Sequence, residues 1–204
     1  MATLRRSLPV LAAAALLATG CGYNTIQTKD EAVNGAASQI KTQLQRRADL
    51  IPNLVETVKG FARQESTVFI AVADARSRLS GAVQSGDLKQ MGEANQALNA
   101  PLGRLLAIVE NYPELKSNAN FLSLQDQLEG TENRISVARQ DYNAAVQDLN
   151  TALERFPTNM LNKMFGFKPR AFFQSEAGAE KAPTVNFNFG SPTPAPAATA
   201  ATTP

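Results

Sequence analysis

FLSLQDQLEGTENRISVARQDYNAAVQDLNTALERF, residues 121–156, is the stretch of sequence that decides the fold. Its apolar or small side chains recur in steps of three and four, at Phe121, Leu124, Leu128, Thr131, Ile135, Ala138, Tyr142, Ala145, Leu149, Ala152 and Phe156. A period near 3.5 residues is typical of a helix that buries one face, whereas a strand would alternate every second residue. The pattern predicts one helix of about 35 to 40 residues, roughly 55 Å long, that ends at Pro157.

The same test predicts a helix near the start of the chain. Its apolar seam contains Val33, Ala37, Ile40, Leu44, Arg47, Ile51, Leu54, Val58 and Phe61. Pro52 falls inside this seam, and proline removes a helical hydrogen bond. We therefore expect a kink or a break between Asp49 and Asn53.

Two shorter helical patterns lie between these segments. The first covers residues 68–82 and is followed by Gly86, with Asp87 placed to cap the second. The second covers residues 88–112 and contains Pro101, a further expected kink. Four amphipathic helices with short connections predict an all-α fold, an elongated antiparallel bundle of about four helices with a short irregular C-terminal segment. The alternative is an extended coiled coil between copies, which the short turns disfavour.

The first 21 residues have the three parts of a secretory signal. Arg5 and Arg6 form a positive start, Leu8–Leu17 is a short apolar run, and Ala18-Thr19-Gly20 supplies small residues before Cys21. The run is shorter than the about 20 apolar residues that a membrane span requires. Leu17–Cys21 resembles the bacterial lipobox, so we expect cleavage after residue 20 and acylation of Cys21. The alternative is an ordinary signal peptide with a chance cysteine at the boundary.

Acylation at Cys21 would make this protein a lipoprotein of the bacterial cell envelope. Two or three acyl chains, at about 0.8 kcal/mol per buried methylene, make a durable anchor. Aspartate after the cysteine favours inner-membrane retention in Gram-negative lipoproteins, but this chain has Gly22. We therefore expect the protein on the periplasmic side of the outer membrane.

Four regions follow from these patterns: residues 1–20 are a signal peptide, 21–29 a lipidated N-terminus and linker, 30–189 the bundle domain, and 190–204 a disordered Pro/Ala/Thr tail. The segment after Pro157 is rich in Met, Leu and Phe. It either contacts a membrane or a partner, or folds back over the end of the bundle. Residues 185–189 alternate like a short strand, with no second strand to pair with.

Composition excludes several classes of function. Without Arg5 and Arg6, the 20 basic residues become 18, equal to the 18 acidic residues, which argues against a nucleic-acid partner. The chain has no histidine and one cysteine, so the commonest general base, the commonest metal ligand and any intrachain disulfide are missing. No glycine-rich phosphate loop is present. We expect no catalytic residues, no cofactor and no metal site.

Arg47 interrupts the apolar seam of the first helix, and a buried guanidinium needs a partner. Our hypothesis is a buried polar pair of Arg47 with Glu132, which lies beside Thr131 in the last helix, or with Asp49. The alternative is that Arg47 extends along the surface on its aliphatic stem.

Several motifs resemble those of one bacterial family, LemA. They are QLQRRADLIPNLVETVKGF at 43–61, NANFLSLQDQLEGTENRI at 118–135, ARQDYN at 138–143, FPTN at 156–159, GFKP at 166–169, and Phe172-Phe173. The resemblance spans roughly residues 23–189. It implies an α-helical bundle and a membrane-associated protein without established catalytic residues. Many LemA-like proteins have an uncleaved N-terminal transmembrane segment, and the lipobox departs from that pattern.

Two functions are compatible with these features. The first is a non-enzymatic envelope scaffold or protein-interaction module, with a membrane contact through Cys21 and envelope proteins as partners. The alternative is a small-molecule or lipid-binding module with a cavity opened at Pro52 and Pro101. The two hypotheses differ in the bundle interior, which would be filled in the first and hollow in the second.

Overall fold

The computed structural model describes residues 2–156, 158–159 and 166–173, and for residues 2–22 the backbone alone. This part of the chain contains the helices α1 (Ala2–Lys59), α2 (Ser66–Ser85), α3 (Leu88–Val109), the single turn α4 (Pro113–Lys116), and α5 (Ala119–Glu154). Its backbone has no strand within those ranges. The predicted all-α class is confirmed.

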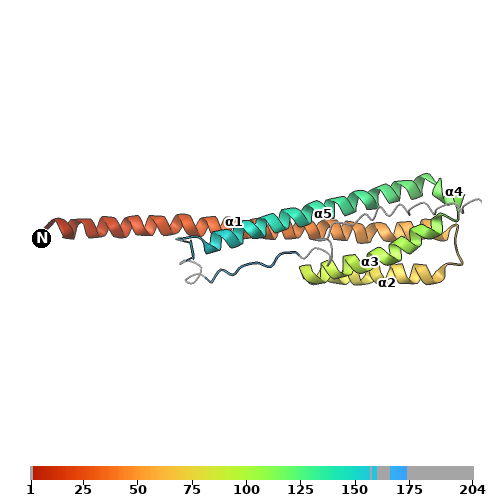
Figure 1. Cartoon of the computed structure of the whole chain (residues 1–204), viewed down its shortest axis with the longest axis horizontal. Helices are drawn as coiled ribbons and strands as arrows, with labels where there is room; N and C mark the ends of the chain where they lie inside the picture. Colours follow the sequence, from red (N-terminus) through yellow and green to blue (C-terminus); the bar gives the residue numbers. More distant parts are fainter. Residues whose placement is uncertain (1, 157, 160–165, 174–204) are drawn as a thin grey trace, which may run out of the picture. The chain divides into compact units, whose positions relative to one another are not determined.

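The four long helices pack as an antiparallel bundle. Helix α5 runs back along α1, and α2 and α3 form a hairpin against the C-terminal half of α1 (Figure 1). Helix α1 therefore contacts each of the other long helices. The predicted helical bundle is confirmed.

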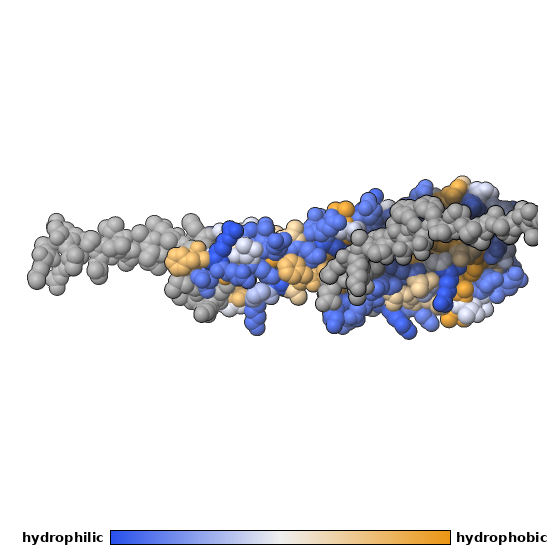
Figure 2. Space-filling model, viewed as in Figure 1, coloured by the Kyte–Doolittle hydropathy of each residue, from blue (hydrophilic) through white to orange (hydrophobic). Residues whose placement is uncertain are grey.

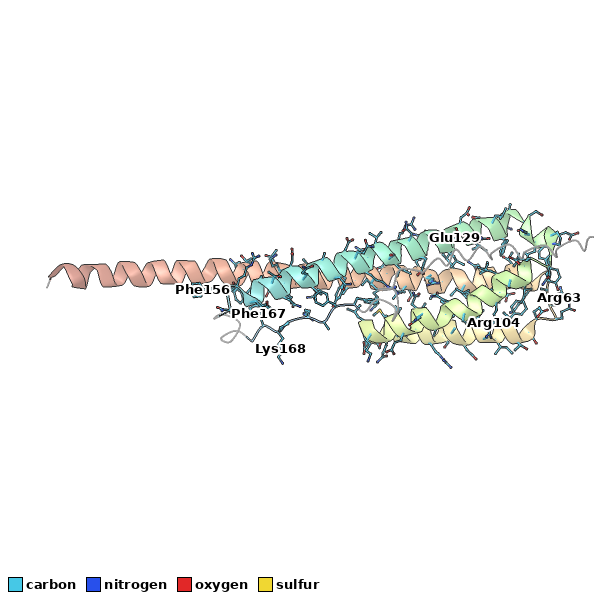
Figure 3. The ribbon with its side chains drawn as sticks, viewed as in Figure 1. Arg63, Arg104, Glu129, Phe156, Phe167 and Lys168 are labelled. Carbon is cyan, nitrogen blue, oxygen red and sulfur yellow. The ribbon has the colours of Figure 1, made fainter. Side chains whose placement is uncertain are left out.

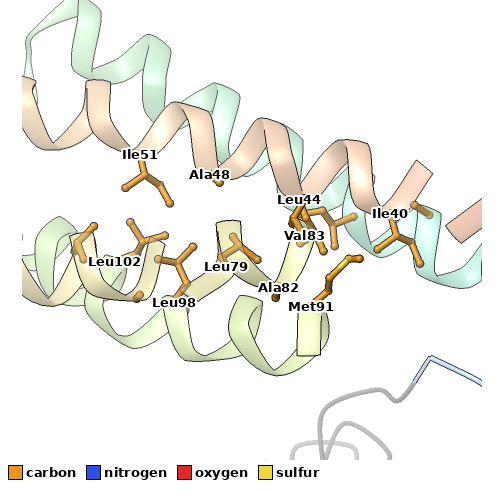
Figure 4. Packing of buried hydrophobic residues seen from close by; sticks show 14 of the residues in the cluster. Ile40, Leu44, Ala48, Ile51, Leu79, Ala82, Val83, Met91, Leu98 and Leu102 are labelled. Carbon is orange, nitrogen blue, oxygen red and sulfur yellow. The ribbon is translucent and has the colours of Figure 1, made fainter. Parts of the chain in front are cut away.

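The core lies where the hairpin meets α1. Ile40, Leu44 and Ile51 on α1 face Leu79 of α2 and Leu98 of α3 (Figure 4). All five side chains are almost completely buried. Burying a Leu or Ile side chain stabilises a fold by about 1.5–3 kcal/mol, so this contact holds the hairpin on α1.

Polar caps set the starts of the last two long helices. Gly86 ends α2 with a φ of 76°, a conformation that suits glycine. The Asp87 carboxylate then accepts hydrogen bonds from the backbone N–H groups of Lys89 (2.8 Å) and Gln90 (3.2 Å). The predicted cap is therefore confirmed. Asn118 caps α5 in the same way.

Pro52 does not break α1, which continues as a helix to Lys59. A proline lacks the N–H that would bond to the carbonyl four residues earlier, here that of Ala48. The Arg76 side chain of α2 donates from Nε to this carbonyl oxygen at 3.0 Å. Of the expected kink or break, the break is wrong, because a neighbouring helix supplies a donor to the Ala48 carbonyl.

Replacing Arg76 with alanine is expected to destabilise the fold by about 1–2 kcal/mol, because the Ala48 carbonyl would lose its donor. In a Pro52→Ala background the cost should fall, since that substitution restores the helical N–H. Urea unfolding followed by circular dichroism measures both values. Arg78→Ala, an exposed substitution two residues away, is the matched control. Equal costs of Arg76→Ala in both backgrounds would contradict this explanation.

Near the C-terminus of α5 the buried positions differ from the predicted seam. Phe156, the last predicted seam residue, is 78% exposed, whereas Val146 and Leu153 are buried. A straight helix has 3.6 residues per turn, so a strict 3.5-residue pattern rotates away from the core. The predicted burial of Phe156 is wrong because α5 ends at Glu154, two residues earlier.

Some predicted boundaries are left untested. Residues 23–29 belong to α1, and Ile26 is fully buried, but the boundaries at residues 20, 29 and 189 stay predictions. The strand-like residues 185–189 and the tail 190–204 lie outside the described residues. Among the residues searched, no helix is both long and apolar enough for a membrane span.

Candidate functional site

A polar cluster lies inside the bundle, centred on Arg47. Arg47 is buried, and its Nη1 contacts Glu132 Oε2 on α5. The same guanidinium donates hydrogen bonds to Asn95 Oδ1 at 2.5 Å and to Asn99 Oδ1 at 2.9 Å, both on α3. One side chain thus joins α1, α3 and α5.

Burial is the main influence on the pKa of Arg47. Loss of water lowers the pKa of the guanidinium, while the charge of Glu132 and its hydrogen bond raise it and the charge of Arg139 lowers it. The contact of Glu132 Oε2 with Arg47 Nη1 is an ion pair. The Glu132 side chain is 45% exposed, so water partly screens this pair.

The structure brings together Arg47 and Glu132, the two residues of the hypothesised pair. Asp49, the other candidate, is exposed and accepts a hydrogen bond from Gln45. Asn95 and Asn99 were not predicted as partners. A signal was present, because Asn95 occupies an apolar seam position and Asn99 follows one helical turn later.

The cluster holds helices together and has no evident chemistry. It contains no nucleophile, and an arginine guanidinium does not exchange its proton near neutral pH. No group of three or more potential metal ligands occurs among the residues that were searched. The arrangement instead links one position on each of three helices, as buried polar groups that specify register do.

A second polar arrangement fastens residues 166–173, which we call the strap, to α5. Asn150 accepts from the Arg170 N–H at 2.9 Å and donates to the Arg170 carbonyl at 3.0 Å. Asn143 makes the same two bonds with Phe173, at 2.8 and 3.2 Å. Seven helical residues span about 10.5 Å and three extended residues about 10 Å, so the two spacings match.

The strap also contacts α1 through its arginine. The Arg170 guanidinium pairs with Asp30 at 2.9 Å and donates to Asn34 at 3.4 Å. Tyr142 donates its hydroxyl to the Ala171 carbonyl at 3.0 Å, and burial raises the pKa of Tyr142 although the charge of Arg170 opposes this. The strap therefore bridges α1 and α5.

The aromatic side chains of the strap differ in burial. Phe173 is buried and lies over Gly92 of α3, where a Cβ atom would come within 3.1 Å of its ring. Arg139 of α5 covers the same ring at 5.0 Å. Phe172 is 53% exposed. Phe173 thus folds back onto the bundle, as one of the two predictions for this segment has it. The other apolar residues of the segment, Met160, Leu161, Met164 and Phe165, lie outside the described residues.

Asn143→Ala is expected to release this end of the strap, because the backbone N–H and carbonyl of Phe173 would both lose their hydrogen bonds. We expect a loss of about 1–2 kcal/mol in the free energy of unfolding. Trypsin should cleave after Arg170 faster than in the unchanged protein. Asn120→Ala, an exposed asparagine of the same helix, is the control. Unchanged cleavage in Asn143→Ala would show that the two hydrogen bonds of Asn143 do not hold the strap in place.

Two surface depressions are candidate ligand sites. One, of about 620 Å³, lies where α1 meets α2 and is lined by Val55, Lys59, Arg63, Phe69 and Ile70 among others. The other, of about 440 Å³, lies between α2 and α3. Neither is lined by Pro52 or Pro101, the residues at which the alternative hypothesis places its cavity.

Cys21, the predicted lipidation site, lies among the residues whose side chains are not described. Its backbone belongs to α1. The expected acylation is therefore untested by the structure.

Comparison with known proteins gives a consistent set of relatives. A family model described as LemA family matches residues 36–187. The chain is 29% identical over 197 residues to magnetosome protein MamQ 2 of Paramagnetospirillum magneticum, covering 85% of this chain and 72% of that protein. It is 29% identical to magnetosome protein MamQ of Magnetospirillum gryphiswaldense, covering 78% and 66%. It is 22% identical to protein LemA of Metamycoplasma hominis, covering 74% and 68%.

Proposed function

The chain belongs to the LemA family, and from this premise we propose that it is a lipid-anchored, non-enzymatic scaffold or protein-interaction module of the bacterial envelope. The observation that carries the proposal is the interior of the bundle. Buried aliphatic side chains fill it, and its central charged group is committed to contacts between helices. Because its interior is filled, we expect such a domain to act through contacts at its surface.

The anchor and the location rest on the sequence. Cys21 follows a short apolar run and small residues, and it is the only cysteine of the chain. We place the protein on the periplasmic side of the outer membrane because Gly22 follows the cysteine. Two named relatives are magnetosome proteins and a third is named for the family alone, so we propose no particular process.

The small-molecule or lipid-binding alternative is less well supported. Leu98, Leu102 and Leu105 surround Pro101 along α3 and are buried, and Ile51 and Leu54 flank Pro52 in the same way. Side chains thus fill the space where that hypothesis needs a cavity.

Proximity labelling tests the scaffold role. A biotin ligase fused after Pro204 of the lipidated full chain should label a reproducible set of envelope proteins. A Cys21→Ser chain with the same fusion is the control, because it keeps the bundle and lacks the acylation site. The proposal fails if both chains label the same abundant neighbours.

A further inference from the structure

We propose that three aromatic residues at one end of the bundle, Tyr23, Phe156 and Phe167, rest in the headgroup region of the membrane that holds Cys21. We call these residues the aromatic collar. The inference rests on the proposed lipid anchor and adds a second contact, made by the protein itself. It specifies the occupant of this surface as a lipid bilayer.

The register of α1 against α5 places the collar at the level of the anchor. Lys29 Nζ lies 3.5 Å from Asp148 Oδ2, which fixes these positions opposite each other. Residue 21 is eight residues before Lys29, and Phe156 is eight residues after Asp148. Because α1 and α5 are antiparallel, these two positions lie at about the same level. The contact of Arg47 with Glu132 gives the same register to within two residues.

Two collar residues expose aromatic surface to solvent. Phe156 is 78% exposed and Tyr23 is 38% exposed. The Tyr23 ring meets the ring of Phe167 with centroids 5.7 Å apart, so α1 and the strap meet here. Figure 3 labels Phe156 and Phe167 at this end of the bundle, and Figure 2 shows hydrophobic surface there.

A bilayer fits this surface better than a protein partner does. Tyr23 follows the anchored cysteine by two residues, so the acyl chains hold the collar within a few ångströms of the headgroups. Aromatic rings favour the interface between hydrocarbon and water. The exposed cations Arg155 and Lys168 lie beside the collar and outnumber Glu154, which suits anionic headgroups.

Other exposed phenylalanines lie too far away to share this contact. Phe172 adjoins Phe173, whose N–H donates to Asn143, and Asn143 is thirteen residues from Phe156, or about 20 Å along the axis. Phe61 follows the C-terminal end of α1 and is two residues from Arg63 in sequence. Figure 3 shows Arg63 at the other end of the bundle from the collar. The headgroup region of one leaflet is only about 5–7 Å thick. These two residues therefore serve as controls.

The chain has no tryptophan, so a single substitution creates a unique depth reporter. Phe156→Trp and Tyr23→Trp are made in the lipidated full chain, with Phe172→Trp and Phe61→Trp as matched controls. Each protein is reconstituted into vesicles of phosphatidylethanolamine and phosphatidylglycerol that contain phospholipid brominated near the headgroup. Tryptophan fluorescence then reports bromine contact, and intact mass reports acylation of Cys21.

We expect both collar reporters to lose most of their fluorescence while the two controls keep theirs. Acylated protein whose collar reporters stay as bright as the controls would overturn the collar and leave the anchor intact. Equal quenching at all four positions would also overturn it, since the bundle would then lie flat on the membrane. A chain without acylation at Cys21 would overturn the anchor, and the collar with it.

Discussion

Glu132→Lys is expected to lower the free energy of unfolding by about 2–4 kcal/mol. The substitution removes the anion that offsets the buried Arg47 guanidinium and places a second cation beside it, with the Arg139 charge already acting on Arg47. Breaking a fully buried pair costs about 3–5 kcal/mol, and the partial exposure of Glu132 reduces this value. Urea unfolding followed by circular dichroism measures the loss, which should also lower Tm by about 2–4 °C per kcal/mol.

Glu129→Lys is the matched control for this experiment. Glu129 lies on the same helix (Figure 3), is exposed, and accepts a hydrogen bond from Gln125. The same charge reversal should change stability by no more than about 0.5 kcal/mol. If Arg47→Leu is more stable than the unchanged protein and Glu132→Lys costs as little as Glu129→Lys, the cluster does not hold the helices together.

Cys21→Ser is expected to abolish incorporation of radiolabelled palmitate and to remove the protein from the outer-membrane fraction. Serine cannot form the thioether that carries diacylglycerol, and the chain has no other cysteine to replace it. The expected change is from a fully labelled protein to an unlabelled one. Metabolic labelling followed by membrane fractionation measures both effects.

Gly22→Asp separates acylation from sorting. This variant keeps Cys21 and should incorporate palmitate, while its aspartate should move the protein to the inner-membrane fraction. Label that persists in Cys21→Ser would contradict acylation at this residue. An unchanged location of Gly22→Asp would contradict the outer-membrane assignment alone.

The helices could be predicted because burial imposes a period on the sequence. The α5 pattern from Phe121 to Tyr142 lies on the buried side of the observed helix, and Asp87 caps α3 as expected. At Val146 and Leu153 the small difference in period has moved the buried positions by one residue, and Phe156 lies beyond the end of α5 at Glu154. Long regular elements can thus be predicted from local spacing, and their ends only approximately.

Pro52 shows what local spacing omits. Proline interrupts an isolated helix, and the continuity of α1 depends on Arg76, a residue of another helix. That contact becomes visible only when the register of α2 against α1 is known. A break at Pro52 is therefore the expectation for the isolated segment, and the packed molecule does not have one.

The polar contacts were predictable in part. Arg47 could be identified because a charge in an apolar seam needs a partner, and Glu132 was one of two candidates. Asn143 and Asn150 could not be identified, because they bind the backbone of the strap and not a complementary side chain. A backbone partner leaves no pattern in the sequence.

Mass spectrometry of the mature N-terminus tests the lipid anchor most directly. A lipid-anchored protein should give an N-terminal peptide that begins at Cys21 and carries two or three acyl chains. A peptide that retains residues 1–20, begins at another residue, or contains unmodified Cys21 would contradict the anchor.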